Sequence, residues 1–207
     1  MRAISDTLTT YIDQVTDNFD SIPQDRKILL EQFADYITKE LGELKKCDLN
    51  FICTHNSRRS HLSQVWAQIA ATYYGYETVR CYSGGTEGTA FYKSGIQALR
   101  NAGISIEKMS EASNPIYALK YAPDSHPVIC FSKKFDHVFN PTSRFCAVMT
   151  CAHADQNCPH IPQATIRIPI RYDDPKVADG TDYELAKYEE RSLQIATEMF
   201  YSFSNVG

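Results

Sequence analysis

The chain has 207 residues, of which 43% are hydrophobic, and a formal net charge of -4. This length is enough for one domain with a sizeable core, or for one domain with an appendage. The acidic balance argues against general nucleic-acid binding, which needs a basic face. No apolar run follows a basic start, and no apolar stretch is long enough to cross a bilayer. We therefore expect neither a signal peptide nor a membrane span.

Residues 1–46 are predicted to form two helices. Apolar side chains recur at helical spacing within residues 4–19 and again within residues 29–41. The break at residues 21–23 (Ser-Ile-Pro) offers a capping serine and a proline suited to the first helical turn. Gly42 is the expected end of the second helix. We interpret the pair as an extension that covers one face of the main domain, with dimerisation as the alternative.

Residues 47–207 are predicted to form one α/β domain, because candidate strands and helices alternate along them. The candidate strands are Leu49–Ile52, Thr78–Ser83, Val128–Phe131 and Phe145–Met149, and helices are expected after Ser60, Tyr92 and Asp182. This alternation predicts a three-layer sandwich with a central four-stranded parallel sheet, to which the N-terminal helices are added. Ligands of such sheets bind beyond the carboxyl ends of the strands.

The first candidate site is residues 53–60, Cys-Thr-His-Asn-Ser-Arg-Arg-Ser, between a short buried strand and a helix. The amides of such a loop and the dipole of the following helix attract a tetrahedral anion. The same field favours the thiolate of Cys53, which is the nucleophilic form. Arg59 can offer two donors to the anion, and Ser60 can donate a hydrogen bond to the sulfur. The candidate oxyanion-binding residues are Thr54, His55, Asn56, Ser57, Arg58, Arg59 and Ser60.

The chain contains seven cysteines and no recognisable secretion signal. This combination favours reduced thiols, metal ligands or redox residues over a disulfide scaffold, and it indicates a cytoplasmic protein. An inert core thiol is the alternative for Cys53, but its place between a strand and a helix favours a nucleophile. Four cysteines in or beside apolar strands are interpreted as structural: Cys47, Cys81, Cys130 and Cys146.

The second candidate site is residues 151–160, directly after an apolar strand. Cys151 and Cys158 could form a thiol relay if the segment between them refolds. Together with His153 and His160 they could instead bind zinc, although their spacing matches no common zinc pattern. The third interpretation is that the two thiols are incidental.

The third candidate site is Asp173-Asp174-Pro175. An acidic pair before a proline often only marks a turn. Beside a thiolate and its anion, however, a carboxylic acid can protonate the departing oxygen. The sequence leaves open whether Asp173 or Asp174 would be this acid.

Together the three sites resemble the low-molecular-weight protein tyrosine phosphatase fold family, and most of all its thioredoxin-coupled arsenate reductases. Residues 53–60 are similar to the family's phosphate loop, and residues 83–88 resemble its Ser-Ala-Gly-Thr segment. Residues 151–159 match the reductases' Cys-x-x-Ala-Asp-x-Asn-Cys-Pro at every fixed position. Residues 173–175 match their Asp-Asp-Pro, where the phosphatases carry Asp-Pro. The resemblance covers residues 48–200 in the right order.

Three residues depart from the family pattern. His55 stands where the family usually has glycine, so we expect a positive φ at His55 and an energetic cost there. Arg58 replaces a residue that is usually cysteine, which adds positive charge beside the anion. Gln64 replaces an acidic residue that belongs to a potassium site in some reductases, so no metal site is predicted.

The resemblance implies an arsenate reductase that needs no cofactor. Cys53 would attack arsenate, with Asp174 or Asp173 as the acid. Cys151 would then attack Cys53 and release arsenite, and Cys158 would attack Cys151 to form the final disulfide. A thioredoxin-type reductant would return this pair to thiols.

The alternative within the same family is a tyrosine phosphatase. Cys53 would then form a phosphocysteine, Asp174 would donate and later withdraw a proton, and both Cys151 and Cys158 would be dispensable. A sensor that binds an oxyanion without chemistry, or a structural zinc protein, is the non-enzymatic alternative. The expected partner is an arsenate or phosphate oxyanion, with no nucleic acid and no membrane. The sequence leaves the oligomeric state open.

Overall fold

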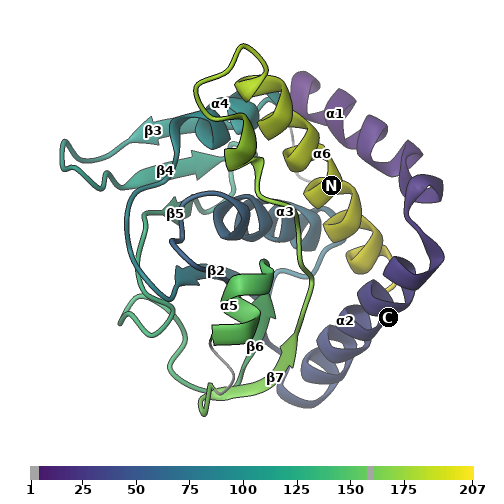
Figure 1. Cartoon of the computed structure of the whole chain (residues 1–207). Coiled ribbons are helices and arrows are strands. Elements are labelled where there is room, and N and C mark those ends of the chain that lie inside the picture. Colours follow the sequence, from purple (N-terminus) through teal and green to yellow (C-terminus); the bar gives the residue numbers. More distant parts are fainter. Residues whose placement is uncertain (1–4, 158–160) are drawn as a thin grey trace.

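Four parallel strands form the central sheet of this computed structural model, which describes residues 5–157 and 161–207. The sheet has the order β2-β1-β6-β7, and every neighbouring pair is parallel. Figure 1 labels β2, β6 and β7 of this sheet. In that order the strands are Val79–Gly85, Cys47–Cys53, Phe145–Met149 and Ala164–Ile168. The predicted four-stranded parallel sheet is therefore confirmed, and the carboxyl ends of β1 and β6 lie side by side.

The prediction that residues 128–131 belong to this sheet was wrong. Val128–Cys130 forms β5 of a second, antiparallel sheet with β4 (Tyr117–Lys120) and β3 (Ser105–Lys108). The fourth parallel strand is β7, in which only the last residue, Ile168, is buried. Because β7 lies at the edge of the sheet, it lacks the continuous apolar run by which buried parallel strands are recognised.

Helices cover one face of the parallel sheet. The helices α2 (Gln24–Leu44) and α3 (Arg59–Tyr73) pack on β1, and α6 (Glu184–Ser204) packs on both of them. The helices α1 (Asp6–Asp17) and α4 (Lys93–Asn101) pack in turn on α6. Within the described residues, no helix combines the length and the apolar character that a membrane crossing requires.

The side chains of β1 contribute to two different cores. Phe51 belongs to the large core beneath the helices. Ile52 and Cys53 belong to a smaller cluster, to which Ala154 of α5 (Ala152–Asn157) contributes. The result is the predicted three-layer α/β sandwich, whose second outer layer consists of the short α5 and loops.

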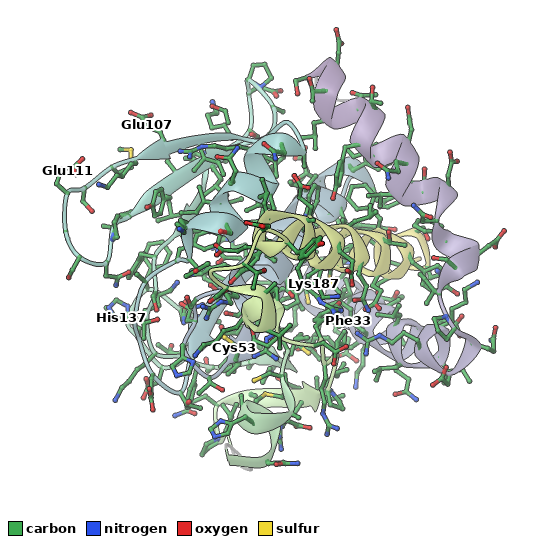
Figure 2. All side chains as sticks on the ribbon, turned by 45° about the horizontal axis from the view of Figure 1, so that its top comes forward. Phe33, Cys53, Glu107, Glu111, His137 and Lys187 are labelled. Carbon is green, nitrogen blue, oxygen red and sulfur yellow. The ribbon has the colours of Figure 1, made fainter. Side chains whose placement is uncertain are left out.

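The two predicted N-terminal helices are present as α1 and α2, joined by a 3-10 turn at Phe19–Ser21. Phe33 of α2 meets Phe51 of β1 edge to face, with ring centroids 6.4 Å apart; Figure 2 labels Phe33 among the packed side chains. Tyr11 of α1 stacks on Trp66 of α3 at 5.1 Å. The N-terminal helices thus contribute to the main core.

The boundaries of α2 differ from the prediction. The helix starts after Pro23, which occupies the N-cap position in place of Ser21 and provides no side-chain cap. The Ser21 hydroxyl donates to the carbonyl oxygen of Asn18. At its other end the helix continues through Gly42 to Leu44. Lys45 ends it with a left-handed φ of 59°. The prediction that Gly42 ends the helix was therefore wrong.

Candidate active site

Cys53, labelled in Figure 2, is the last residue of β1. Only 3% of its surface is exposed. Two groups lie at hydrogen-bond distance from its sulfur: the N–H of Asn56 and the hydroxyl of Ser60, both at 3.1 Å. The Ser60 oxygen accepts from Asn56 Nδ2 at 2.9 Å, so the Ser60 proton is available to point at Cys53. Two donors aimed at one sulfur suit a negatively charged thiolate.

The strained residue of this loop is Asn56, not His55. Asn56 has a φ of 44°, whereas His55 is not in the left-handed region. Asparagine tolerates this conformation better than most residues, and its Oδ1 accepts from the backbone N–H of Lys133 at 2.9 Å. The expectation of a positive φ at His55 was therefore wrong. The His55 imidazole is half exposed, 3.7 Å from a carboxylate oxygen of Glu87.

The loop packs directly on Gly85, at the end of β2. A β-carbon on Gly85 would lie 2.6 Å from the backbone carbonyl oxygen of Thr54 and 2.7 Å from the backbone nitrogen of Asn56. Both distances are shorter than real contacts of this type, so glycine is the residue that allows the approach. The Gly-Gly of the segment 83–88 thus has a steric role in shaping the site.

Arg59 connects the loop to the acidic pair. Its Nη2 donates to Asp174 Oδ2 at 2.5 Å, and its Nη1 donates to the carbonyl oxygen of Tyr172 at 2.9 Å. Asp174 also caps the short 3-10 helix Pro175–Ala178. Asp173 has a side chain that is 96% exposed and lies 3.7 Å from Arg191. Of the two aspartates, Asp174 is the one in contact with the loop.

The side chain of Arg58 turns toward α6. Its Nη2 donates to Asp179 Oδ2 and its Nε donates to the hydroxyl of Tyr188, both at 2.5 Å. The guanidinium also lies over the Tyr92 ring, 4.3 Å from the centroid. The neighbouring Ser57 is buried, and its carbonyl accepts from the N–H of Tyr92 at 2.9 Å. The charge of Arg58 is thus compensated by Asp179.

Cys151 lies beside the oxyanion loop. It follows β6, and its Sγ is 3.6 Å from the hydroxyl oxygen of Thr54, the residue after Cys53. Cys151 is 1% exposed and belongs to the same apolar cluster as Cys53. The structure thus brings together two of the predicted cysteines. The third, Cys158, lies outside the described residues, as does His160 of the zinc alternative.

The short helix α5, which follows Cys151, is fixed by one carboxylate. Asp155 is paired with Arg167 of β7 and with Arg171, and 9% of its side chain is exposed. The fixed aspartate of the Cys-x-x-Ala-Asp pattern therefore anchors the segment between the two proposed redox cysteines. In the described residues, no group of three or more acidic, histidine or cysteine side chains is arranged to hold a metal ion.

A buried polar network lies beneath the loop. Gln64 donates to the Cys81 carbonyl at 3.2 Å and accepts from the Ser83 hydroxyl at 2.6 Å. The Ser83 oxygen lies 3.2 Å from Nδ1 of His61. Burial lowers the pKa of His61 well below its usual value, and the positive charge of Lys133 lowers it further. Neutral groups therefore occupy this space, with Gln64 at its centre.

The cysteines interpreted as structural differ electrostatically from a reactive thiol. Burial raises the pKa of the thiols of Cys47, Cys81 and Cys146, and it raises the pKa of Cys130 to about 12. Such thiols stay protonated and inert. These four buried cysteines are therefore suited to packing within and beside the strands.

Several residues of the site were missed by sequence analysis. Lys133 supports Asn56, while Asp179 and Tyr188 hold Arg58. His153 appeared only as a possible zinc ligand, yet its Nδ1 lies 3.1 Å from the Thr54 hydroxyl. These residues have no motif of their own, so only their spatial proximity to the motifs identifies them.

The family model described as "Low molecular weight phosphotyrosine protein phosphatase" matches residues 48–122. The chain is 27% identical over 165 residues to an arsenate reductase of Bacillus licheniformis, which covers 79% of this chain and 99% of that protein. It is also 27% identical over 160 residues to an arsenate reductase of Staphylococcus aureus, with coverage of 77% and 99%.

A solved structure with a similar fold is a mutant of the arginine phosphatase YwlE with a phosphorylated active-site serine. The TM-score is 0.50 at 12% identity, over 76% of this chain and 93% of that chain. The parallel sheet and the sequence similarity around Cys53 lead to the same conclusion. The chain has the fold of low-molecular-weight protein tyrosine phosphatases, its residues 48–122 match the model of that family, and over most of its length it is similar in sequence to arsenate reductases.

Proposed function

We propose that this protein is an arsenate reductase in which Cys53 is the nucleophile and Cys151 and Cys158 are the redox pair. The observation that most supports this function is the position of Cys151, whose sulfur lies 3.6 Å from the hydroxyl oxygen of Thr54. The N–H of Thr150 donates to the Ile52 carbonyl at 2.8 Å, so β6 and β1 end together. A thiol that must attack Cys53 has to start from this end of the sheet.

Arsenate would bind to the amides of the loop and to Arg59. The Nε of Arg59 is buried and has no hydrogen-bond partner within the described residues. A buried donor without a partner is costly, and an oxygen of the anion would satisfy it. The Cys53 thiolate would attack arsenic, and Asp174 would protonate the departing oxygen.

The reduction step transfers two electrons from sulfur to arsenic. The Cys151 thiolate attacks the Cys53 sulfur and forms a Cys53–Cys151 disulfide. The bond between Cys53 and arsenic breaks, its electron pair stays on arsenic, and As(V) becomes As(III), which leaves as arsenite. Cys158 then attacks Cys151, which frees Cys53 and leaves a Cys151–Cys158 disulfide. A thioredoxin-type reductant, a partner implied by the family resemblance, returns this pair to thiols.

A single-turnover reaction with arsenate, followed by non-reducing peptide mapping, tests this proposal. The expected products are one arsenite and one Cys151–Cys158 disulfide per protein. The variant Cys158→Ser should stop at the Cys53–Cys151 disulfide, and Cys151→Ser should form neither. Arsenate reduction that proceeds equally well in Cys151→Ser would contradict the relay.

The second candidate function is hydrolysis of a phosphate ester. It is favoured by the Arg59–Asp174 contact, which supplies an acid beside the oxyanion loop without any need for Cys151. The family model that matches residues 48–122 also includes Cys53 but ends before Cys151. Aryl phosphate hydrolysis that survives loss of both Cys151 and Cys158, with no arsenate reduction by the unmodified protein, would decide for a phosphatase.

A further inference from the structure

The hydroxyl group of Thr54 lies between Cys151 and His153. Its oxygen is 3.6 Å from Cys151 Sγ and 3.1 Å from His153 Nδ1. A hydroxyl can accept one hydrogen bond and donate another at the same time. The sulfur of Cys151 already accepts from the N–H of Ala154 at 3.3 Å. This contact favours the direction in which the thiol donates to Thr54 and Thr54 donates to Nδ1 of His153.

Burial makes this chain of hydrogen bonds important for Cys151. The thiol has to lose its proton before the sulfur can act as a nucleophile. Cys151 is 1% exposed, so bulk water has little access to it. The His153 side chain, in contrast, belongs to an exposed residue at the start of α5. Thr54 therefore connects a buried proton donor to an exposed proton acceptor.

We propose that His153 is the general base for Cys151 and that it acts through the hydroxyl of Thr54. The proton of the thiol passes to the Thr54 oxygen, while the Thr54 proton passes to Nδ1 of His153. The products are a Cys151 thiolate, an imidazolium and an unchanged threonine, so charge and protons balance. The thiolate is then ready for attack on the Cys53 sulfur, a step that rests on the proposed function.

This role separates His153 from the first chemical step. Attack of Cys53 on the oxyanion uses the loop, Arg59 and Asp174, none of which needs His153. The second step needs the Cys151 thiolate and therefore His153. Replacement of His153 should slow disulfide formation without slowing the attack by Cys53.

The reaction of Cys151 with methyl methanethiosulfonate tests the base without arsenate. The measurement uses full-length protein carrying Cys53→Ser and Cys158→Ser, with Cys151 modification followed by peptide mass spectrometry. Adding His153→Ala should slow modification by about 10- to 100-fold, and millimolar imidazole should restore most of the rate to this variant. Thr54→Val should be equally slow but insensitive to imidazole, whereas Thr54→Ser should keep the rate. His126→Ala, at an exposed histidine before β5, is the matched control.

The second measurement is formation of the Cys53–Cys151 disulfide from arsenate in the Cys158→Ser protein, where the same His153→Ala and imidazole effects are expected. Equal rates with and without His153, or a slow variant that imidazole does not restore, would overturn the base assignment. If no arsenite forms but methyl methanethiosulfonate still reveals the His153 dependence, the proposed function is wrong and the base assignment stands. If arsenite forms at the same rate without His153, the function stands and the base assignment is wrong.

Discussion

Arg59 and Asp174 are 115 residues apart in the chain, yet Nη2 of the arginine donates to Oδ2 of the aspartate at 2.5 Å. The arginine begins α3 and the aspartate caps a short 3-10 helix, so the contact connects the oxyanion loop to the C-terminal part of the chain. It also gives the two adjacent aspartates different environments. Asp174 is held at the site, and Asp173 is almost fully exposed.

Asp174→Asn is therefore expected to lower kcat/KM for an aryl phosphate with a poor leaving group by about 100-fold, because a general acid contributes this much or more. Asp173→Asn is the matched control and should change kcat/KM by less than about twofold. Steady-state kinetics over a series of leaving groups measures both. A larger effect for Asp173 than for Asp174 would exchange the two roles.

The two arginines of the loop are expected to differ in oxyanion affinity. Arg59→Lys should weaken the binding of inorganic phosphate by about tenfold, because lysine lacks the Nε donor, which in Arg59 is buried and has no partner within the described residues. Arg58→Lys should weaken it by only about twofold, since the Arg58 guanidinium is already engaged by Asp179 and Tyr188. Isothermal titration calorimetry measures both affinities. Equal losses would mean that Arg58 also contacts the anion.

Gly85 is expected to be intolerant of a side chain. Gly85→Ala should lower the free energy of unfolding by about 2–4 kcal/mol, because the new carbon would meet backbone atoms of the oxyanion loop. Gly42→Ala is the control, since a β-carbon at this position inside α2 would meet no atom within 4 Å apart from its chain neighbours and the backbone of its own helix. That substitution should stabilise by about 0.5–1 kcal/mol. Urea denaturation distinguishes the two, and an unchanged Gly85→Ala protein would contradict the close approach.

The N-terminal helices are expected to be part of the folding unit. Phe33→Ala should lower the free energy of unfolding by about 3–5 kcal/mol, because Phe33 is fully buried in the main core. Ile28→Ala, at a position that is 51% exposed on the same helix, should cost less than about 1 kcal/mol. A protein truncated before residue 47 that unfolds at the same urea concentration as the full chain would contradict this expectation.

Lys133 is expected to make stability depend on alkaline pH. Burial lowers the pKa of Lys133 to about 8, whereas an unfolded lysine titrates near ~10.4. Between these values the unfolded chain binds more protons at this site, so the contribution of Lys133 to the unfolding free energy rises with pH. Raised pKa values of buried thiols such as Cys130 act in the opposite direction. The informative quantity is therefore the difference between wild type and Lys133→Met.

The difference in unfolding free energy between the wild type and Lys133→Met can be measured by urea denaturation from about pH 7 to about pH 10.5. The wild type should gain stability relative to the variant as pH rises. At neutral pH the variant should be at least as stable as the wild type, because it no longer buries an ammonium group. A difference that is constant with pH would mean that Lys133 is not titrating in this range.

The sequence was sufficient for motifs that are local. The residues from Cys53 to Ser60 form a strand end, a loop and a helix start, and each part carries its own pattern. The strand β6 was found because it is a continuous apolar run, as buried parallel strands are. The edge strand β2 was found because its apolar residues alternate with exposed or half-exposed ones at the start of the strand. The edge strand β7 has mostly exposed residues, so its pattern did not differ from that of a loop.

Two errors have the same physical origin. The apolar run at Val128–Cys130 correctly indicated a strand, but hydrophobicity does not specify the partner strand. Likewise, the family's glycine at the position of His55 led us to expect a positive φ at His55, but the next residue, Asn56, has the positive φ. Strand pairing and backbone φ are both decided by contacts between distant segments. The strand β5 pairs with β4, and Asn56 accepts a hydrogen bond from Lys133.

The sequence by itself determined the candidate nucleophile, the order of the three motifs and the α/β class, because these depend on residue type and local periodicity. Only the tertiary structure decided which aspartate meets Arg59, that Arg58 turns to Asp179, and that Thr54 stands between Cys151 and His153. These contacts join segments about a hundred residues apart. They follow from the parallel order of the strands, which brings the ends of β1 and β6 together, and no local pattern encodes that proximity.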